Sequence, residues 1–158
     1  LEAVSSLAPG FHGGNMDVAD VRPGNTVFLP VKVPGALLYV GDGHAAQGDA
    51  EVCGVAVEVP TRGTLSVQVI KNMAIGTPRV ESRDYIMAVG SARPMEDAAR
   101  IAFYELVMWL ETDYGIERLT AYMLCSQVAR VRLANMVDTL YSIVAKFPKR
   151  YLPPQRDQ

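Results

Sequence analysis

The side chains with the most chemical potential lie in one short stretch, Gly41-Asp42-Gly43-His44-Ala45-Ala46-Gln47-Gly48-Asp49-Ala50-Glu51. Within ten positions it carries three carboxylates (Asp42, Asp49 and Glu51), the imidazole of His44 and the carboxamide of Gln47, separated by small residues. In an extended backbone the i, i+2 spacing would aim Asp42 with His44, and Asp49 with Glu51, to common faces. Burying such a cluster without a ligand or partner is energetically costly. We therefore expect residues 42–51 to form a site.

The residue types in this stretch limit which metal ions it could bind and which reactions it could support. An imidazole with carboxylates suits zinc or another divalent cation better than copper(I) or an iron–sulfur cluster. A divalent cation lowers the pKa of water, and a nearby carboxylate can carry a proton to a leaving amine. Gln47 and Asn15 each offer a carbonyl and an amide that could hold a primary carboxamide. The spacing is not that of an EF-hand calcium loop.

Three motifs carry a resemblance to a known family over nearly the whole chain. They are His12-Gly13-Gly14-Asn15-Met16-Asp17, then Leu29-Pro30-Val31 with Gly35-Ala36-Leu37, then Gly41 to Gly54. Ala121-Tyr122-Met123-Leu124, Ser126 and Pro148-Lys149 extend the match. In order and spacing the chain resembles the C-terminal part of acetamidase/formamidase family enzymes.

The resemblance implies hydrolysis of short linear amides, such as formamide or acetamide, to carboxylate and ammonia. It also implies a divalent metal ion, with zinc expected first and calcium or magnesium as alternatives, and a homo-oligomer. The expected site residues are Asp42, His44 and Asp17 as metal ligands, Glu51, Asp49 and His44 as catalytic groups, and Asn15, Gln47 and His12 as substrate contacts. Glu51 is an alternative metal ligand, so which acid binds the metal and which moves the proton stays open.

Two departures from the family pattern bear on function. Family members usually have glycine in the place of Ala50, and after Ser126 they tend to show Gly-Asp-Leu-Arg where this chain has Gln-Val-Ala-Arg. Family enzymes also extend further at the N-terminus, and a separate N-terminal chain is one way to supply that part. A non-catalytic binding or assembly module is therefore the alternative function. A cysteine hydrolase using Cys53 is a more distant one, because small strand cysteines usually fill cores.

The elements that must position these residues predict an α+β fold in two lobes. We expect residues 1–76, which carry the first three motifs, to form a small antiparallel sheet or barrel. We expect residues 77–158 to form a mixed α/β lobe with two helices. The expected strands are 26–33, 36–40, 52–59, 64–71, 84–89, 131–133 and 141–147. The expected helices are 97–111, which ends before Gly115, and 117–128, with Leu119, Tyr122 and Met123 facing inward.

Composition excludes several protein classes. A net charge of −2 and a pI near 5.7 give no electrostatic reason to expect nucleic acid as a partner. The sequence has no apolar run of the roughly 20 residues that span a bilayer, so no membrane association is expected. Cys53 and Cys125 do not make a disulfide framework, and a cytoplasmic location with reduced thiols is expected.

Overall fold

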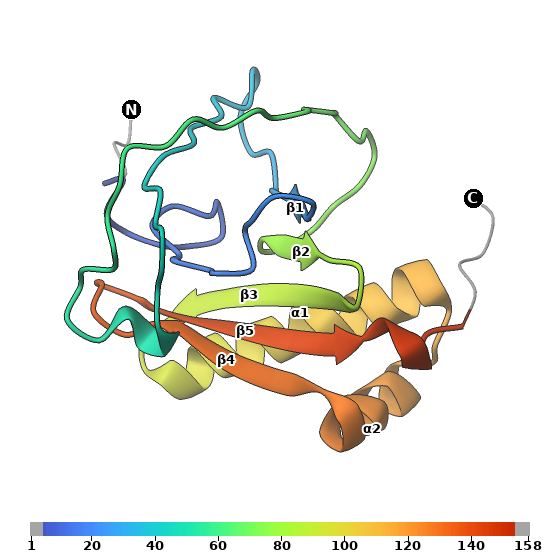
Figure 1. Ribbon diagram of the computed structural model, residues 1–158. Coiled ribbons are helices and arrows are strands. Elements are labelled where there is room, and N and C mark those ends of the chain that lie inside the picture. Colours follow the sequence, from blue (N-terminus) through green and yellow to red (C-terminus); the bar gives the residue numbers. More distant parts are fainter. Residues whose placement is uncertain (1–4, 154–158) are drawn as a thin grey trace.

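The computed structural model describes residues 5–153 and has an α+β fold built on one antiparallel sheet (Figure 1). The sheet has five strands in the order β1-β2-β3-β5-β4. The strands are β1 (Thr26–Phe28), β2 (Arg79–Glu81), β3 (Tyr85–Ala92), β4 (Arg130–Asn135) and β5 (Tyr141–Pro148). Short 3-10 turns lie at Asp49–Glu51 (η1) and Lys149–Tyr151 (η2).

Helix α1 (Met95–Tyr114) lies along one face of the sheet, against β3 and β5, and helix α2 (Arg118–Val128) packs beside it (Figure 1). The helix can approach β3 closely because Gly90 lacks a side chain. A Cβ at Gly90 would lie 2.1 Å from the carbonyl oxygen of Ala98. α1 ends at Gly115, whose left-handed backbone (φ 65°) returns its N–H to the carbonyls of the last turn. Glu117 caps α2 by accepting hydrogen bonds from Leu119 N and Thr120 N.

Alternate residues of the central strands face two different cores. On β3, Ile86 and Ala88 belong to the larger core beneath the helices, with Phe147 of β5. Met87 and Val89 belong to a smaller core on the other face. The N-terminal segment covers that second face, with Val18 buried and Met16 packed against it. This covering brings residues 15–17 to the sheet, near the end of β4.

The structure confirms the α+β class and most elements after residue 77. The expected helices 97–111 and 117–128 correspond to α1 and α2, and the expected strands 84–89, 131–133 and 141–147 correspond to β3, β4 and β5. β2 was not expected, because its three residues are too short to show a periodic pattern. β1 belongs to the same sheet as β2, and the division into lobes at residue 76 stays a prediction.

Three expected strands do not form in the described residues. Segments 36–40, 52–59 and 64–71 have no regular secondary structure apart from an isolated bridge at Glu58, and their large apolar side chains are exposed. The expected strand 26–33 is reduced to β1. The alternation that predicted strands is present, but segments 36–40 and 64–71 have no neighbouring strand to pair with in the described part of the chain. Segment 52–59 pairs only with residues 43–46.

The expected inward face of α2 is also wrong. Leu119, Tyr122 and Met123 are exposed, and Tyr122 retains 65% of its accessible surface. The helix instead buries Ala121 and Cys125, because these small side chains allow close packing on the sheet and α1.

Cys53 is exposed rather than a core residue. Across the described residues, both helices are too short or too polar to cross a lipid bilayer.

Candidate functional site

Two arms of one loop carry the centre of the site. Backbone hydrogen bonds join the arms where Ala45 N donates to Val57 O, and Val57 N donates to Ala46 O, each at 2.9 Å. This pairing places His44 opposite Glu58. The turn η1 follows the first arm and reaches the end of β4, where Met136 N donates to Ala50 O at 3.0 Å. The loop therefore meets the sheet where β4 ends.

The side chain of Gln47 holds the His44 ring in position. Gln47 Nε2 donates to the carbonyls of Asp17 (2.6 Å) and Ala134 (3.2 Å), which turns Gln47 Oε1 toward His44 Nδ1 at 3.0 Å. Since Oε1 can only accept, Nδ1 carries a proton and donates it. The neutral ring then presents the lone pair of Nε2 to its other side.

The Nε2 atom of His44 faces two carboxylates without a hydrogen bond. Asp42 Oδ1 lies 3.2 Å and Glu58 Oε2 3.1 Å from it, yet it is buried and has no hydrogen-bonding partner of suitable geometry. Burial lowers the pKa of His44. The hydrogen bond to Gln47 and the two carboxylates outweigh it, so the pKa lies above its ordinary value.

A second pair of acids lies behind the ring. The carboxyl groups of Asp17 and Glu51 share a hydrogen bond, and Glu51 is only 7% exposed. Desolvation, followed by the charge of Asp17, raises the pKa of Glu51 to about 7. Burial also raises the pKa of Asp17, against the lowering effect of its bonds to Glu51 and Asn135. The pair therefore holds a proton near neutral pH, which an ordinary carboxylate pair in water would not.

Asn135 at the end of β4 joins the acids to the sheet. It is completely buried, and its Nδ2 donates to Asp17 Oδ2 at 2.7 Å, to Asn15 O at 3.1 Å and to the carboxylate of Asp138. Its Oδ1 accepts from the backbone N–H of Asp138 and Val137. Asn15 Nδ2 also donates to Asp17 Oδ2 (3.2 Å) and Asp138 Oδ2 (3.0 Å). Two carboxamides thus hold two carboxylates in fixed positions.

The residues fit a divalent cation. Ligand atoms of Asp17, Asp42 and His44 lie within 4.8 Å of one another, as do those of His44, Glu51 and Glu58. Ligands about 2.1 Å from a tetrahedral zinc ion lie about 3.4 Å apart, close to the separations around Nε2. A cation there would give the buried Nε2 a partner and offset the charge of the carboxylates. The donor set of one nitrogen and several oxygens also admits calcium or magnesium.

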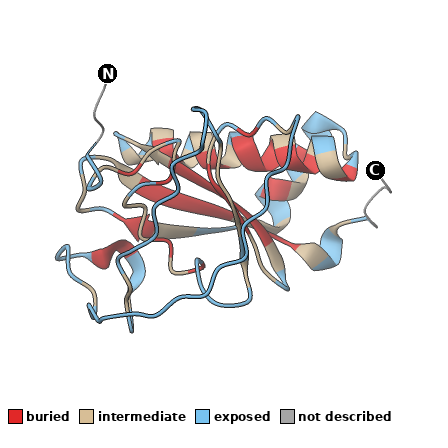
Figure 2. Cartoon of the chain, turned by 90° about the horizontal axis from the view of Figure 1, so that it is seen from above, coloured by how far each residue is buried: buried red, intermediate tan, exposed pale blue. Residues whose placement is uncertain are grey.

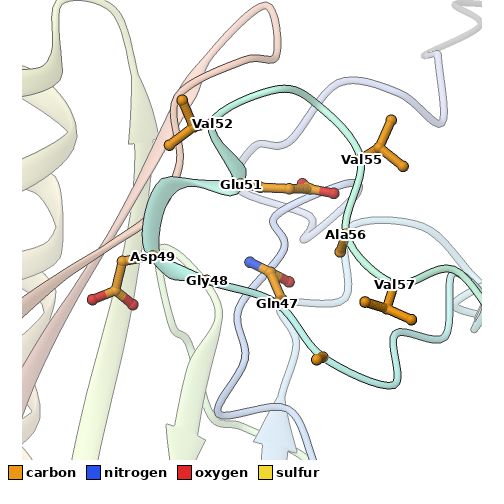
Figure 3. A pocket seen from close by; sticks show the side chains of 9 residues that line it. Gln47, Gly48, Asp49, Glu51, Val52, Val55, Ala56 and Val57 are labelled. Atoms are coloured by element: carbon orange, nitrogen blue, oxygen red, sulfur yellow. The ribbon is translucent and has the colours of Figure 1, made fainter.

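The structure brings most of the predicted site residues together, but not all. Asp42, His44, Gln47, Glu51, Asn15 and Asp17 form one connected cluster. Asp49 points away from it and pairs with Arg132 of β4, contrary to the expected common face with Glu51 (Figure 3). The cause is the backbone, which leaves the extended region at Ala50 (φ 74°) and Glu51 (φ 45°). His12 contacts the ring of Phe11 rather than the cluster.

Three residues of the cluster were not predicted: Glu58, Asn135 and Asp138. Glu58 follows the second arm, and only the pairing of the two arms brings it to His44. Asn135 and Asp138 lie about 120 positions from Asn15 and Asp17, the partners they meet through the fold. The one available signal was that Asn135 and Asp138 lie two and five positions after the expected strand 131–133.

A pocket of about 350 Å³ opens beside the cluster, between residues 46–52 and 55–57. Gln47 and Glu51 point into it, and Val55 and Val57 line its far side (Figure 3). Its wall is therefore apolar on one side and carries the Glu51 carboxyl on the other. Cys53 is not among the lining residues, and its thiol donates to Val55 O at 3.4 Å.

Comparison with known proteins gives a consistent assignment. An acetamidase from Yersinia enterocolitica superposes with a TM-score of 0.94 and 50% identity over 97% of this chain, but over 46% of its own chain. An acetamidase from Bacillus halodurans gives 0.88 and 34% identity over 94% of this chain and 50% of its own. A formamidase from Methylophilus methylotrophus is 37% identical over 73 residues, which are 45% of this chain and 18% of that protein.

The chain thus spans about half the length of the solved relatives that it matches. The acetamidase/formamidase family matches residues 1–150, which include every residue of the cluster described above. The chain belongs to the acetamidase/formamidase family.

Proposed function

We propose that this chain carries the cation-binding and proton-transfer residues of an amidohydrolase for short linear amides, of the formamide or acetamide type. The observation that carries the proposal is the convergence of His44 Nε2 with carboxylates from two arms of one loop, beside a small pocket. His44, Asp42 and Asp17 would hold the cation, with Glu58 as a further ligand on the same side of the ring. A divalent cation bound there would polarise the amide carbonyl and favour ionisation of a water molecule.

Glu51 is the group we assign to proton transfer. Its side chain points into the pocket, and in the cation-free chain its pKa is about 7, so this buried carboxyl exchanges a proton near neutral pH. The water oxygen bonds to the carbonyl carbon while its proton passes to the Glu51 carboxylate. Glu51 then delivers this proton to the amide nitrogen, the C–N bond breaks, and ammonia and the acid leave.

The carboxamides divide into two roles. Gln47 donates its Nε2 protons to two backbone carbonyls and accepts the Nδ1–H of His44 with its Oε1, so it positions the imidazole. Asn15 gives its Nδ2 to Asp17 and Asp138, and its Oδ1 makes no hydrogen bond within residues 5–153. Asn15 Oδ1 is therefore our candidate acceptor for an N–H of the substrate amide.

The proposal extends to the cofactor, the assembly and the location. We propose zinc as the resident cation, because an imidazole is among the ligands, with calcium or magnesium as the alternatives. We also propose a homo-oligomer in the cytoplasm, as the resemblance to the family implies. Elemental analysis of the purified protein and its mass in solution test the first two points.

Glu51→Gln and Asp49→Asn form the matched pair that tests the proton-transfer role. Both replace a carboxylate by its neutral isostere within η1, but only Glu51 belongs to the cluster around His44, whereas Asp49 pairs with Arg132. We measure ammonia release from formamide and acetamide with the cation-loaded protein, complemented by the part of the Yersinia acetamidase that this chain does not match. Glu51→Gln should lower kcat by about 100-fold or more, and Asp49→Asn by a few-fold at most. Bound cation without ammonia release in the parent protein would favour the non-catalytic binding module.

A further inference from the structure

The largest unexplained feature of the molecule is an exposed apolar arch, residues 31–71, apart from the turn η1. In Figure 1 it runs from cyan to green, away from the sheet on the side opposite α1, and in Figure 2 most of it has the colour of exposed residues. The exposed large apolar side chains of the arch are Val31, Val33, Leu37, Leu38, Tyr39, Val40, Val52, Val55, Val57, Val59, Leu65, Val67, Val69 and Ile70. Exposed apolar side chains in this number along one segment favour an interaction site.

The backbone of the arch lacks partners as well. From Pro60 to Ile70, and from Leu38 to Gly41, no backbone N–H or C=O makes a hydrogen bond within residues 5–153. Leu65, Val67 and Val69 alternate with polar Ser66 and Gln68, the pattern of a strand with one buried face. An extended segment with free backbone groups and an apolar face is a template for an added strand.

The course of the arch is shared with a protein of about twice the length. The superposition on the Yersinia acetamidase covers 97% of this chain, so it includes most of the arch, while it leaves more than half of that protein's chain unmatched. An extended segment without internal hydrogen bonds retains a defined course only when it packs against something. The unmatched part of the relative is long enough to supply that contact.

We propose that the two segments of the arch without backbone hydrogen bonds, 38–41 and 60–70, add as strands to a polypeptide equivalent to the half of the solved relatives that this chain does not span. The added strands would bury Leu65, Val67 and Val69 against this polypeptide and bond their backbone groups to it. The proposal concerns only the contact, and it holds whether that polypeptide is joined to this chain or separate from it.

Docking would also fix the acids around His44. Segment 38–41 leads directly into Asp42, and segment 60–70 begins two positions after Glu58. Both acids are about half exposed on their side chains, and they approach His44 Nε2 from opposite arms. The polypeptide that receives the two strands therefore sets the separation of two candidate ligands.

The test co-expresses this chain with the half of the Yersinia acetamidase that it does not match. We expect a one-to-one complex by size-exclusion chromatography with light scattering. Hydrogen exchange should show amides 61–70 and 38–41 unprotected in the free chain and at least about 100-fold slower in the complex. Where the Yersinia half is insoluble, a fusion of that half to this chain gives the same reading.

Matched variants separate strand addition from non-specific adhesion. Val67→Lys lies on the apolar face of segment 60–70 and should weaken the complex at least about tenfold, whereas Gln68→Lys on the opposite face should change affinity by less than about threefold. Val67 is 66% exposed, so neither variant should alter the melting temperature of the free chain. Equal losses for the two variants, no complex and no protection in the fusion, or protection of 60–70 by self-association of the chain alone would each overturn the proposal.

Discussion

Replacing Glu51 by glutamine should stabilise the cation-free protein at alkaline pH and not at acid pH. The pKa of Glu51 is about 7 in the folded chain, against an ordinary value of 4.5. The folded state therefore binds the proton more tightly than the unfolded state, and stability is lost as pH rises from 4.5 to 7. This direction is opposite to that of a salt-bridged acid, whose pKa falls on folding.

The magnitude follows from the same shift. Each pKa unit corresponds to about 1.4 kcal/mol, so an ionised Glu51 at pH 8 costs the fold on the order of 3 kcal/mol. Glutamine has nearly the same shape but no charge, and it removes the repulsion with Asp17. We expect Glu51→Gln to raise the free energy of unfolding by up to about 3 kcal/mol at pH 8, and by less than about 1 kcal/mol at pH 5.

Urea unfolding followed by circular dichroism, with a chelator present, measures both values. Glu96→Gln is the control, because Glu96 is an exposed acid in the first turn of α1, away from the cluster. It should change stability by less than about 0.5 kcal/mol at either pH. The reasoning is refuted if Glu51→Gln has the same effect at both pH values, or if it destabilises the protein at pH 8.

Three further substitutions test the site and its support. His44→Ala should lower the affinity for zinc by at least about 100-fold in a calorimetric titration, whereas His12→Ala should leave it within about threefold, and similar losses would remove His44 from the ligand set. Ala50→Gly should raise the free energy of unfolding by about 1 kcal/mol, because the backbone there is left-handed, and a lower stability would contradict that conformation. Gly90→Ala should lower the free energy of unfolding by more than about 3 kcal/mol, because its Cβ would lie 2.1 Å from a carbonyl oxygen of α1. Gly63→Ala is the control, because the space around Gly63 is open, and it should change the free energy of unfolding by less than about 0.5 kcal/mol in the same urea experiment.

The elements that sequence predicted well are those whose partners lie within this chain. α1 and the strands β3 and β5 bury their apolar faces against one another, so their periodicity and their burial agree. Segments 36–40 and 64–71 have a comparable apolar pattern, but nothing in residues 5–153 covers them. An apolar pattern indicates which face a segment is able to bury. It does not indicate whether the polypeptide that would cover this face is present.

The candidate site divides in the same way. The stretch 42–51 was identifiable because its polar groups are close in sequence, and most of them do converge. Asp49 and Glu51 diverge because the chain turns left-handed between them, which an alanine at position 50 conceals and a glycine would have indicated. Asn135 and Asp138 join the site only through the packing of β4 against the N-terminal segment, and local spacing contains no trace of that contact.

The backbone conformations of four site residues indicate that the cation-free chain is strained at the site. Asp17 (φ 47°), Asp42 (φ 59°), Ala50 (φ 74°) and Glu51 (φ 45°) all have left-handed conformations, although none is a glycine. Each such residue costs about 1–2 kcal/mol, somewhat less for aspartate. Hydrogen bonds from the end of β4 and within the loop offset part of that cost, but carboxylates held close to one another add repulsion. A bound cation would remove the repulsion, and the proposed strand addition beside Asp42 and Glu58 would fix the loop, so the two proposals act on the same unfavourable energy in different ways.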